Sequence, residues 1–178
     1  MRYLNESDKS STIYRKKIIL EEYDIKNFSY VSTRPNVFLS HSSKDIDKLE
    51  QVIEFLQDYN VNVYIDKRDP NLPPVTSSKT AEILKNNIRK CDKFIVLISE
   101  NSKDSRWIPW ELGIADYAKT TEKIALLPYA KYYASSTWTT QEYLGLYRRI
   151  LNLENSDGWV VYDHKEKKYL KLSTWLKN

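Results

Sequence analysis

Two tryptophans accompany one glutamate in the segment SKDSRWIPWELGIADYA, residues 102–118. Trp107 lies four positions before Glu111, and Trp110 lies directly before it. Residues four apart share one face of a helix, so a helix here places the Trp107 ring beside the Glu111 carboxylate. Such a carboxylate suits a ribose, because its oxygens accept from the hydroxyls while the ring stacks on a base. It would also stabilise an oxocarbenium-like transition state during cleavage of a glycosidic bond.

The alternative for Glu111 is a solvated charge near a helix start, where the helix dipole favours acids. For the tryptophans the alternative to a ligand contact is core packing. Because Trp110 points to a different side of the helix from Glu111, we expect Trp110 to be the core residue and Trp107 to border the site.

Polar residues also follow the apolar segment 36–40, which is rich in strand formers. Ser40, His41 and Ser42 stand where this strand would end. Hydroxyls and backbone N–H groups at such a place can hold a phosphate. Capping of the next helix is the alternative.

Charged residues stand at the end of the segment VNVYID, residues 61–66, which is expected to be a second strand. Asp66 ends this expected strand, and Lys67 and Arg68 come next. The two basic side chains could pair with a pyrophosphate. A solvated loop is the alternative reading.

Apolar periodicity predicts strands and helices in alternation from residue 36 onward. The strands are expected at 36–40, 61–66, 93–99 and 123–129, with a terminal strand pair within 158–172. The helices are expected at 46–56, 81–91, 107–119 and 143–151, the last opened by a capping box in TTQE, residues 139–142. This alternation predicts an α/β domain with a mostly parallel sheet covered on both faces.

Ligands of such sheets bind beyond the carboxyl ends of the strands. The loops expected there are 41–45, 66–78, 99–107 and 128–138, the last containing YYASSTW. Glu111 lies one turn into the helix that follows the third loop, so it is placed to face the crevice.

Length and composition limit the possible classes of protein. The 178 residues suggest one domain, and the 41% hydrophobic content is enough for a core. We place the domain at 35–178 and treat 1–34 as an N-terminal extension, within which 11–31 reads as either a helix or a strand pair. The net charge of +4 comes from the flanks, since residues 36–158 carry 16 Lys+Arg against 17 Asp+Glu. Nucleic-acid binding is therefore not expected.

The sequence lacks the motifs of glycine-rich nucleotide-binding loops and of zinc sites. Three glycines form neither G-x-G-x-x-G nor a P-loop, and two histidines with one cysteine give no zinc-ligand spacing. We expect Cys91 to pack as a small apolar residue, and a single cysteine fits a reducing cytoplasm. The polar N-terminus is unlike a secretory signal, and the longest apolar run, 94–98, is too short for a membrane helix.

Three segments together resemble a bacterial Toll/interleukin receptor (TIR) domain. NVFLSHSSKD is similar to the family's first box, with S-H/Y-S-x-x-D after an apolar strand. NVYIDKRDPNLPP resembles its second strand and BB loop, which includes Pro73. The long segment from 83 to 113 resembles the family signature that ends in S-x-W-x-x-x-E-L, here Ser105, Trp107, Glu111 and Leu112. The resemblance covers about residues 35 to 130.

The resemblance implies a flavodoxin-like fold and, in enzymatic members, cleavage of NAD at the nicotinamide–ribose bond. Glu111 would then be catalytic, Trp107 would stack on the ligand, and Ser40, His41 and the loop 66–74 would border the site. The resemblance implies NAD as the substrate, and it implies neither a cofactor nor a metal. Small bacterial members often serve anti-phage defence of the Thoeris type, in which the product, an ADP-ribose derivative, activates a separate effector.

The BB loop departs from the family pattern, because it usually carries a glycine and here reads DPNLPP. Proline stiffens this loop, which bears on the self-association through which many TIR domains complete their active site. Two rival functions remain: a TIR–TIR adaptor without catalysis, and an enzyme like the nucleoside deoxyribosyltransferases, which use a glutamate nucleophile.

Overall fold

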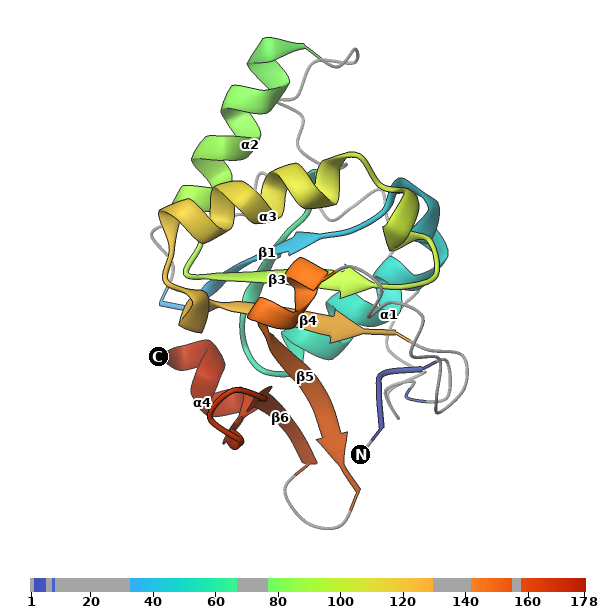
Figure 1. Ribbon diagram of the computed structural model, residues 1–178, viewed down its shortest axis with the longest axis vertical. Coiled ribbons are helices and arrows are strands. Elements are labelled where there is room, and N and C mark those ends of the chain that lie inside the picture. Colours follow the sequence, from blue (N-terminus) through green and yellow to red (C-terminus); the bar gives the residue numbers. More distant parts are fainter. Residues whose placement is uncertain (1, 6–7, 9–32, 67–76, 130–141, 155–157) are drawn as a thin grey trace.

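The computed structural model describes residues 2–5, 8, 33–66, 77–129, 142–154 and 158–178 (Figure 1). Within them, seven strands form one sheet in the order β2-β1-β3-β4-β5-β6-β7. The bounds are β1 Asn36–Ser40, β2 Asn62–Tyr64, β3 Lys93–Ile98, β4 Ile124–Pro128, β5 Arg148–Leu153, β6 Gly158–Asp163 and β7 Lys168–Lys171. Strands β1 to β5 are parallel, and β6 and β7 continue the sheet antiparallel.

Helices cover both faces of this sheet. Their bounds are α1 Ile46–Gln57, α2 Ser78–Lys90, α3 Trp107–Ala118 and α4 Leu172–Lys177. Side chains of α1 and α4 share one apolar cluster with the strands, and side chains of α2 and α3 share the other. Order 2-1-3-4-5 in the parallel part is that of flavodoxin-like folds. The predicted fold class, a three-layer α/β domain with a mostly parallel sheet, is therefore confirmed.

The central strand β3 accounts for the layered core. All six of its residues are buried, as expected for a continuous apolar strand between two helical layers. On the side of α2 and α3, the Phe38 ring lies 5.1 Å from Tyr64 and 5.3 Å from Phe94, centroid to centroid. Cys91 is buried in this cluster, as predicted, and burial raises the pKa of its thiol to about 12.

The helix predicted at 143–151 is wrong. A short 3₁₀ turn, Glu142–Leu146, is followed at once by strand β5. β5 pairs with β4 on one side and with β6 on the other, so it has sheet hydrogen bonds at both edges. Of the expected capping box, residues 139–141 lie outside the described residues. The terminal strand pair is confirmed as β6 and β7. Helix α4, which follows β7, was not predicted from the sequence.

The first residues of the chain are built into the sheet. β4 and β5 pair directly only at Ala125 with Arg148 and Leu126 with Arg149. Beyond those pairs, Leu4 bridges to Tyr129 and Arg2 bridges to Asn152, so residues 2–4 lie between the diverging strands. Leu4 is fully buried in the cluster shared with α1 and α4.

These first residues therefore pack inside the unit that the sequence places at 35–178, whereas residues 9–32 lie outside the described part. Gln51 of α1 fastens the inserted residues. Its Nε2 donates to the Asn5 carbonyl at 2.7 Å, and its Oε1 accepts from the Tyr129 hydroxyl at 2.9 Å.

Replacing Gln51 by alanine is expected to lower the free energy of unfolding by about 1–2 kcal/mol, because both hydrogen bonds are lost. Urea unfolding of Gln51→Ala beside Glu50→Ala measures this effect. Glu50 is the exposed neighbour on the same helix, so its variant controls for the change to alanine. Equal unfolding midpoints for the two variants would contradict the fastening role.

Candidate functional site

Helix α3 directs one acid into the protein interior. Its buried side chains are Ile108, Glu111, Leu112 and Ala115, which follow the helical spacing of a face turned toward the sheet. Glu111 is only 2% exposed. The surface-charge reading of this residue is therefore excluded, since its side chain is withdrawn from solvent.

Ser40 is the direct partner of Glu111. The Ser40 hydroxyl, at the carboxyl end of β1, donates to Oε2 of Glu111 across the interface between β1 and α3. Burial raises the pKa of Glu111 to about 8, the nearby negative charge of Asp66 adds to that rise, and the hydrogen bond from Ser40 opposes it. A carboxyl group with this pKa changes charge easily near neutral pH, which is typical of catalytic acids and bases.

His41 and Asp66 lie at the same edge of the sheet. The Nδ1 atom of His41 is 3.3 Å from the Leu39 carbonyl oxygen and 3.8 Å from Oδ1 of Asp66. The His41 ring is buried, whereas the Asp66 side chain is 29% exposed. The structure thus brings Ser40, His41, Asp66 and Glu111 together at the carboxyl ends of β1 and β2.

Ser42, after β1, and Ser105, from the family signature, both make capping contacts. The Ser42 side chain accepts from the Lys44 amide at 3.4 Å and caps the 3₁₀ turn Ser43–Asp45. The Ser105 side chain accepts from the Ile108 amide at 3.3 Å at the start of α3. For Ser42 this is the helix-capping alternative that the sequence left open.

The two tryptophans differ in burial in the opposite sense to the prediction: Trp107 is the more buried of the two. Trp110 is 38% exposed, and Trp107 is partly buried and packs against the cluster shared by α2 and α3. Their rings meet edge to face, with centroids 5.3 Å apart and planes at 83°. The prediction that Trp110 is the core residue is wrong, because the buried face of α3 runs through Ile108 and Glu111 and leaves Trp110 outside.

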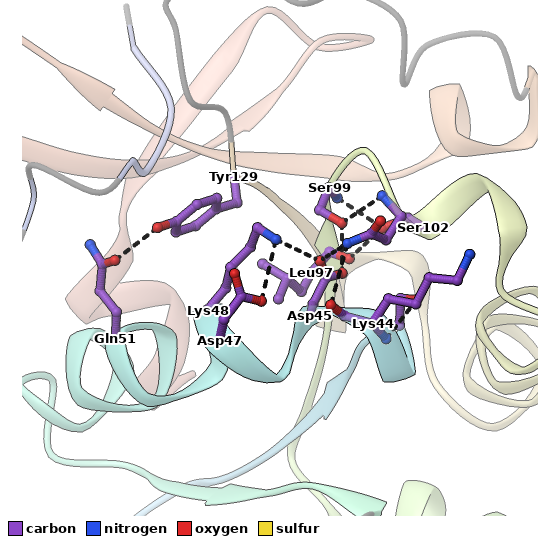
Figure 2. A network of polar contacts seen from close by, with 11 residues as sticks. Lys44, Asp45, Asp47, Lys48, Gln51, Leu97, Ser99, Ser102 and Tyr129 are labelled. Carbon is purple, nitrogen blue, oxygen red and sulfur yellow. Dashed lines mark hydrogen bonds and ion pairs between the residues drawn. The ribbon is translucent and has the colours of Figure 1, made fainter.

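Sequence reasoning assigned no role to Asp45, which is fully buried beside the site. Figure 2 shows its carboxylate at the centre of a polar network between α1 and the loop after β3. The signal was present in the sequence, since Asp45 ends the S-x-x-D pattern that follows β1.

Part of the predicted site lies outside the described residues. This applies to Arg68 and Pro73 in the segment 67–76 and to YYASSTW, residues 132–138. Among the residues that the structure does describe, none of the helices combines the length and the apolar character needed to cross a bilayer.

Comparison with known proteins agrees with this fold. A family model described as TIR domain matches residues 37–130. A probable 3′ cyclic ADP-D-ribose synthase, ThsB′, from Bacillus cereus (strain MSX-D12) is 35% identical over 148 residues, which cover 79% of this chain and 75% of that protein. The chain belongs to the TIR domain family, and the resemblance inferred from its motifs is confirmed.

Two further matches are more distant. A putative cyclic ADP-D-ribose synthase, TIR2, from Cytobacillus dafuensis is 28% identical over 91 residues, or 49% of this chain and 23% of that protein. The crystal structure of the TIR domain of the Toll-related receptor TRR-2 from Hydra magnipapillata aligns with a TM-score of 0.43 and 15% identity, covering 59% of this chain and 78% of that one.

Proposed function

We propose that this TIR domain cleaves the nicotinamide–ribose bond of NAD and closes the remaining ADP-ribose into a cyclic isomer. The observation that carries the proposal is the buried Glu111 carboxyl group, held by Ser40 at the carboxyl edge of the parallel sheet. The relatives named as cyclic ADP-D-ribose synthases support NAD chemistry and a cyclic product.

Glu111 has the properties that this cleavage needs. The nicotinamide ring of NAD carries a positive charge, and a cation beside the buried carboxyl group favours its ionised form. As the bond from C1′ to the nicotinamide nitrogen breaks, its electron pair passes to the ring and neutral nicotinamide leaves. The positive charge then developing at C1′ and the ring oxygen is stabilised by the carboxylate in a site of low dielectric constant.

The next nucleophile at C1′ decides the product. Attack by water, with loss of a proton, gives ADP-ribose. Attack by a ribose hydroxyl or an adenine nitrogen of the same molecule closes a ring and also releases one proton. Our proposal assigns the exclusion of water, and so the preference for ring closure, to Trp107, which packs against the apolar cluster one helical turn before Glu111.

The proposal extends to the setting of the reaction. A cyclic nucleotide made by a TIR domain acts as a signal when a separate effector binds it, as in anti-phage defence of the Thoeris type. We also propose self-association through TIR–TIR contacts, which light scattering over a range of protein concentrations would detect.

The test is incubation of NAD with concentrated protein, followed by chromatography for nicotinamide and mass spectrometry of the nucleotide. A product equal in mass to ADP-ribose minus water is expected. Glu111→Ala is expected to reduce nicotinamide release by a factor of about 10² or more, because the charge that stabilises the transition state is removed.

Glu82→Ala is the matched control, since Glu82 is an exposed glutamate on α2. A folded Glu111→Ala variant that releases nicotinamide at the wild-type rate would refute the assignment. Concentration-dependent assembly without any turnover of NAD would instead support an adaptor. Turnover of a deoxynucleoside with NAD left intact would support a deoxyribosyltransferase.

A further inference from the structure

Asp45 is a fully buried carboxylate held by three donors. Its Oδ2 accepts from the Ser99 hydroxyl at 2.6 Å, and its Oδ1 accepts from Nδ2 of Asn101 at 2.7 Å. Lys48, one turn along α1, adds its ammonium group at 3.1 Å from the same Oδ1. A buried carboxylate with charge-assisted hydrogen bonds on both oxygens fixes the groups around it strongly.

Two of these donors come from the loop that leads from β3 into α3. Inside this loop the Ser102 hydroxyl donates to the Leu97 carbonyl at 3.0 Å and accepts from the Ser99 amide at 2.8 Å. The Ser105 amide donates to the Ser102 carbonyl at 3.1 Å, and Ser105 then caps α3. Hydrogen bonds therefore run without a break from the end of β3 to the first turn of α3.

Two junctions connect the end of β1 and the turn after it with the loop after β3 and α3. One is Asp45 with Ser99 and Asn101, which Figure 2 shows in part, and the other is Ser40 with Glu111. An exposed ion pair, Lys44 with Asp104 at 3.6 Å, adds to the first junction. Asp45 is distant from Glu111 in sequence, but its junction holds the loop that leads into α3. Glu111 lies on the buried face of α3, opposite Ser40.

We propose that Asp45 is a positioning residue for the NAD reaction, which holds the start of α3 so that Glu111 and Trp107 enclose the reacting ribose. The proposal rests on the proposed function. It assigns Asp45 no contact with the substrate: its effect passes through the loop 99–106. Loss of the junction lets α3 shift and admits water beside C1′.

The variant Asp45→Asn tests this role, because asparagine keeps the size but offers one acceptor oxygen and turns an NH₂ group toward donors. Asp47→Asn is the matched control. Asp47 is also an aspartate near Lys48, at 3.5 Å, but its side chain is 73% exposed, whereas that of Asp45 is fully buried.

The main readout is the ratio of ADP-ribose to cyclic product, which does not depend on how much of the protein is folded. We expect this ratio to rise in Asp45→Asn and kcat to fall by roughly tenfold to a hundredfold, as for a small misplacement of reacting groups. Asp47→Asn should match the wild type. Ser99→Ala should shift the ratio in the same direction and add little to Asp45→Asn, because both remove one junction.

Hydrogen exchange over residues 99–111 gives a readout that needs no turnover. Faster exchange there in Asp45→Asn, but not in Asp47→Asn, supports the hold of Asp45 on the start of α3, whereas failure of the proposed function would show separately, as no turnover of NAD by the wild type. A lowered melting temperature with an unchanged product ratio, kcat and local exchange would reduce Asp45 to a purely stabilising residue and overturn the proposal. If Asp45→Asn does not fold, Asn101→Ala takes its place, and an unchanged ratio and unchanged exchange in that variant overturn the proposal equally.

Discussion

Glu111→Gln is expected to be more stable than the wild type at pH 8, although it loses the proposed activity. Glutamine keeps the shape of the side chain and an oxygen that accepts from the Ser40 hydroxyl, but it carries no charge to bury. Folding raises the pKa of Glu111 from its ordinary value of 4.5 to about 8, chiefly by burial. Between these pH values the folded chain holds a proton that the unfolded chain has released.

The stability of the wild type must therefore fall as the pH rises from about 4.5 to about 8. The slope attributable to this one group approaches 1.4 kcal/mol per pH unit, so the total is of the order of a few kcal/mol. Glu111→Gln lacks this contribution. Its advantage over the wild type should be largest near pH 8 and should disappear below pH 4.5, where Glu111 is protonated in both states.

Urea unfolding at several pH values between 4.5 and 8 checks this expectation. Glu82→Gln, on the exposed side of α2, should follow the wild type throughout. Stability curves for wild type and Glu111→Gln that run parallel across the range would show that Glu111 is ionised in the folded state at all these pH values. The expected outcome would mark the site as one where stability is given up for chemistry.

The second large effect concerns the pH dependence of NAD cleavage. In the free protein Glu111 must lose its proton before the carboxylate can stabilise charge at C1′. Because kcat/KM reports the ionisation of the free enzyme, it should rise about tenfold per pH unit below about pH 8 and level off above it. The rate of nicotinamide release at low NAD concentration gives this profile directly.

Two variants should move the midpoint of that profile in opposite directions. Asp66→Asn removes a negative charge that raises the pKa of Glu111, so the midpoint should move to lower pH. Ser40→Ala removes the hydrogen bond that lowers this pKa, so the midpoint should move to higher pH. The midpoint is independent of the active fraction, so a loss of rate in either variant does not obscure it. Shifts in the same direction, or none, would mean that another group controls the profile.

The central strands and α3 were predictable because their signals are local. The apolar run of β3 is bounded by polar residues, and α3 shows its buried face in the spacing of Ile108, Leu112 and Ala115. Glu111 could be singled out because an acid on that apolar face, four residues after a tryptophan, is unusual for a solvated helix. Its partner Ser40 could be placed only by assuming a parallel sheet.

The errors arose where distant contacts decide the structure. Segment 143–151 has apolar residues that fit a helix, but one edge of β4 has no strand partner until β5 pairs with it, so residues 148–153 join the sheet instead. Trp110 was placed in the core by its offset from Glu111, yet the buried stripe of α3 is set by the strands beneath it. The role of Asp45 depends on residues more than fifty positions away, which periodicity does not reveal.

The insertion of residues 2–4 between β4 and β5 makes the beginning of the chain one of the last parts that can be completed. Arg2 pairs with Asn152, and its guanidinium lies over the Trp159 ring at 5.7 Å, so its place exists only after β5 and β6 are made. Closing so long a loop is slow compared with local pairing. Until it closes, the gap between the two diverging strands exposes unpaired backbone groups, and a strand from another molecule can occupy it. Residues 2–4 therefore cover strand edges at which a strand from another molecule would otherwise pair.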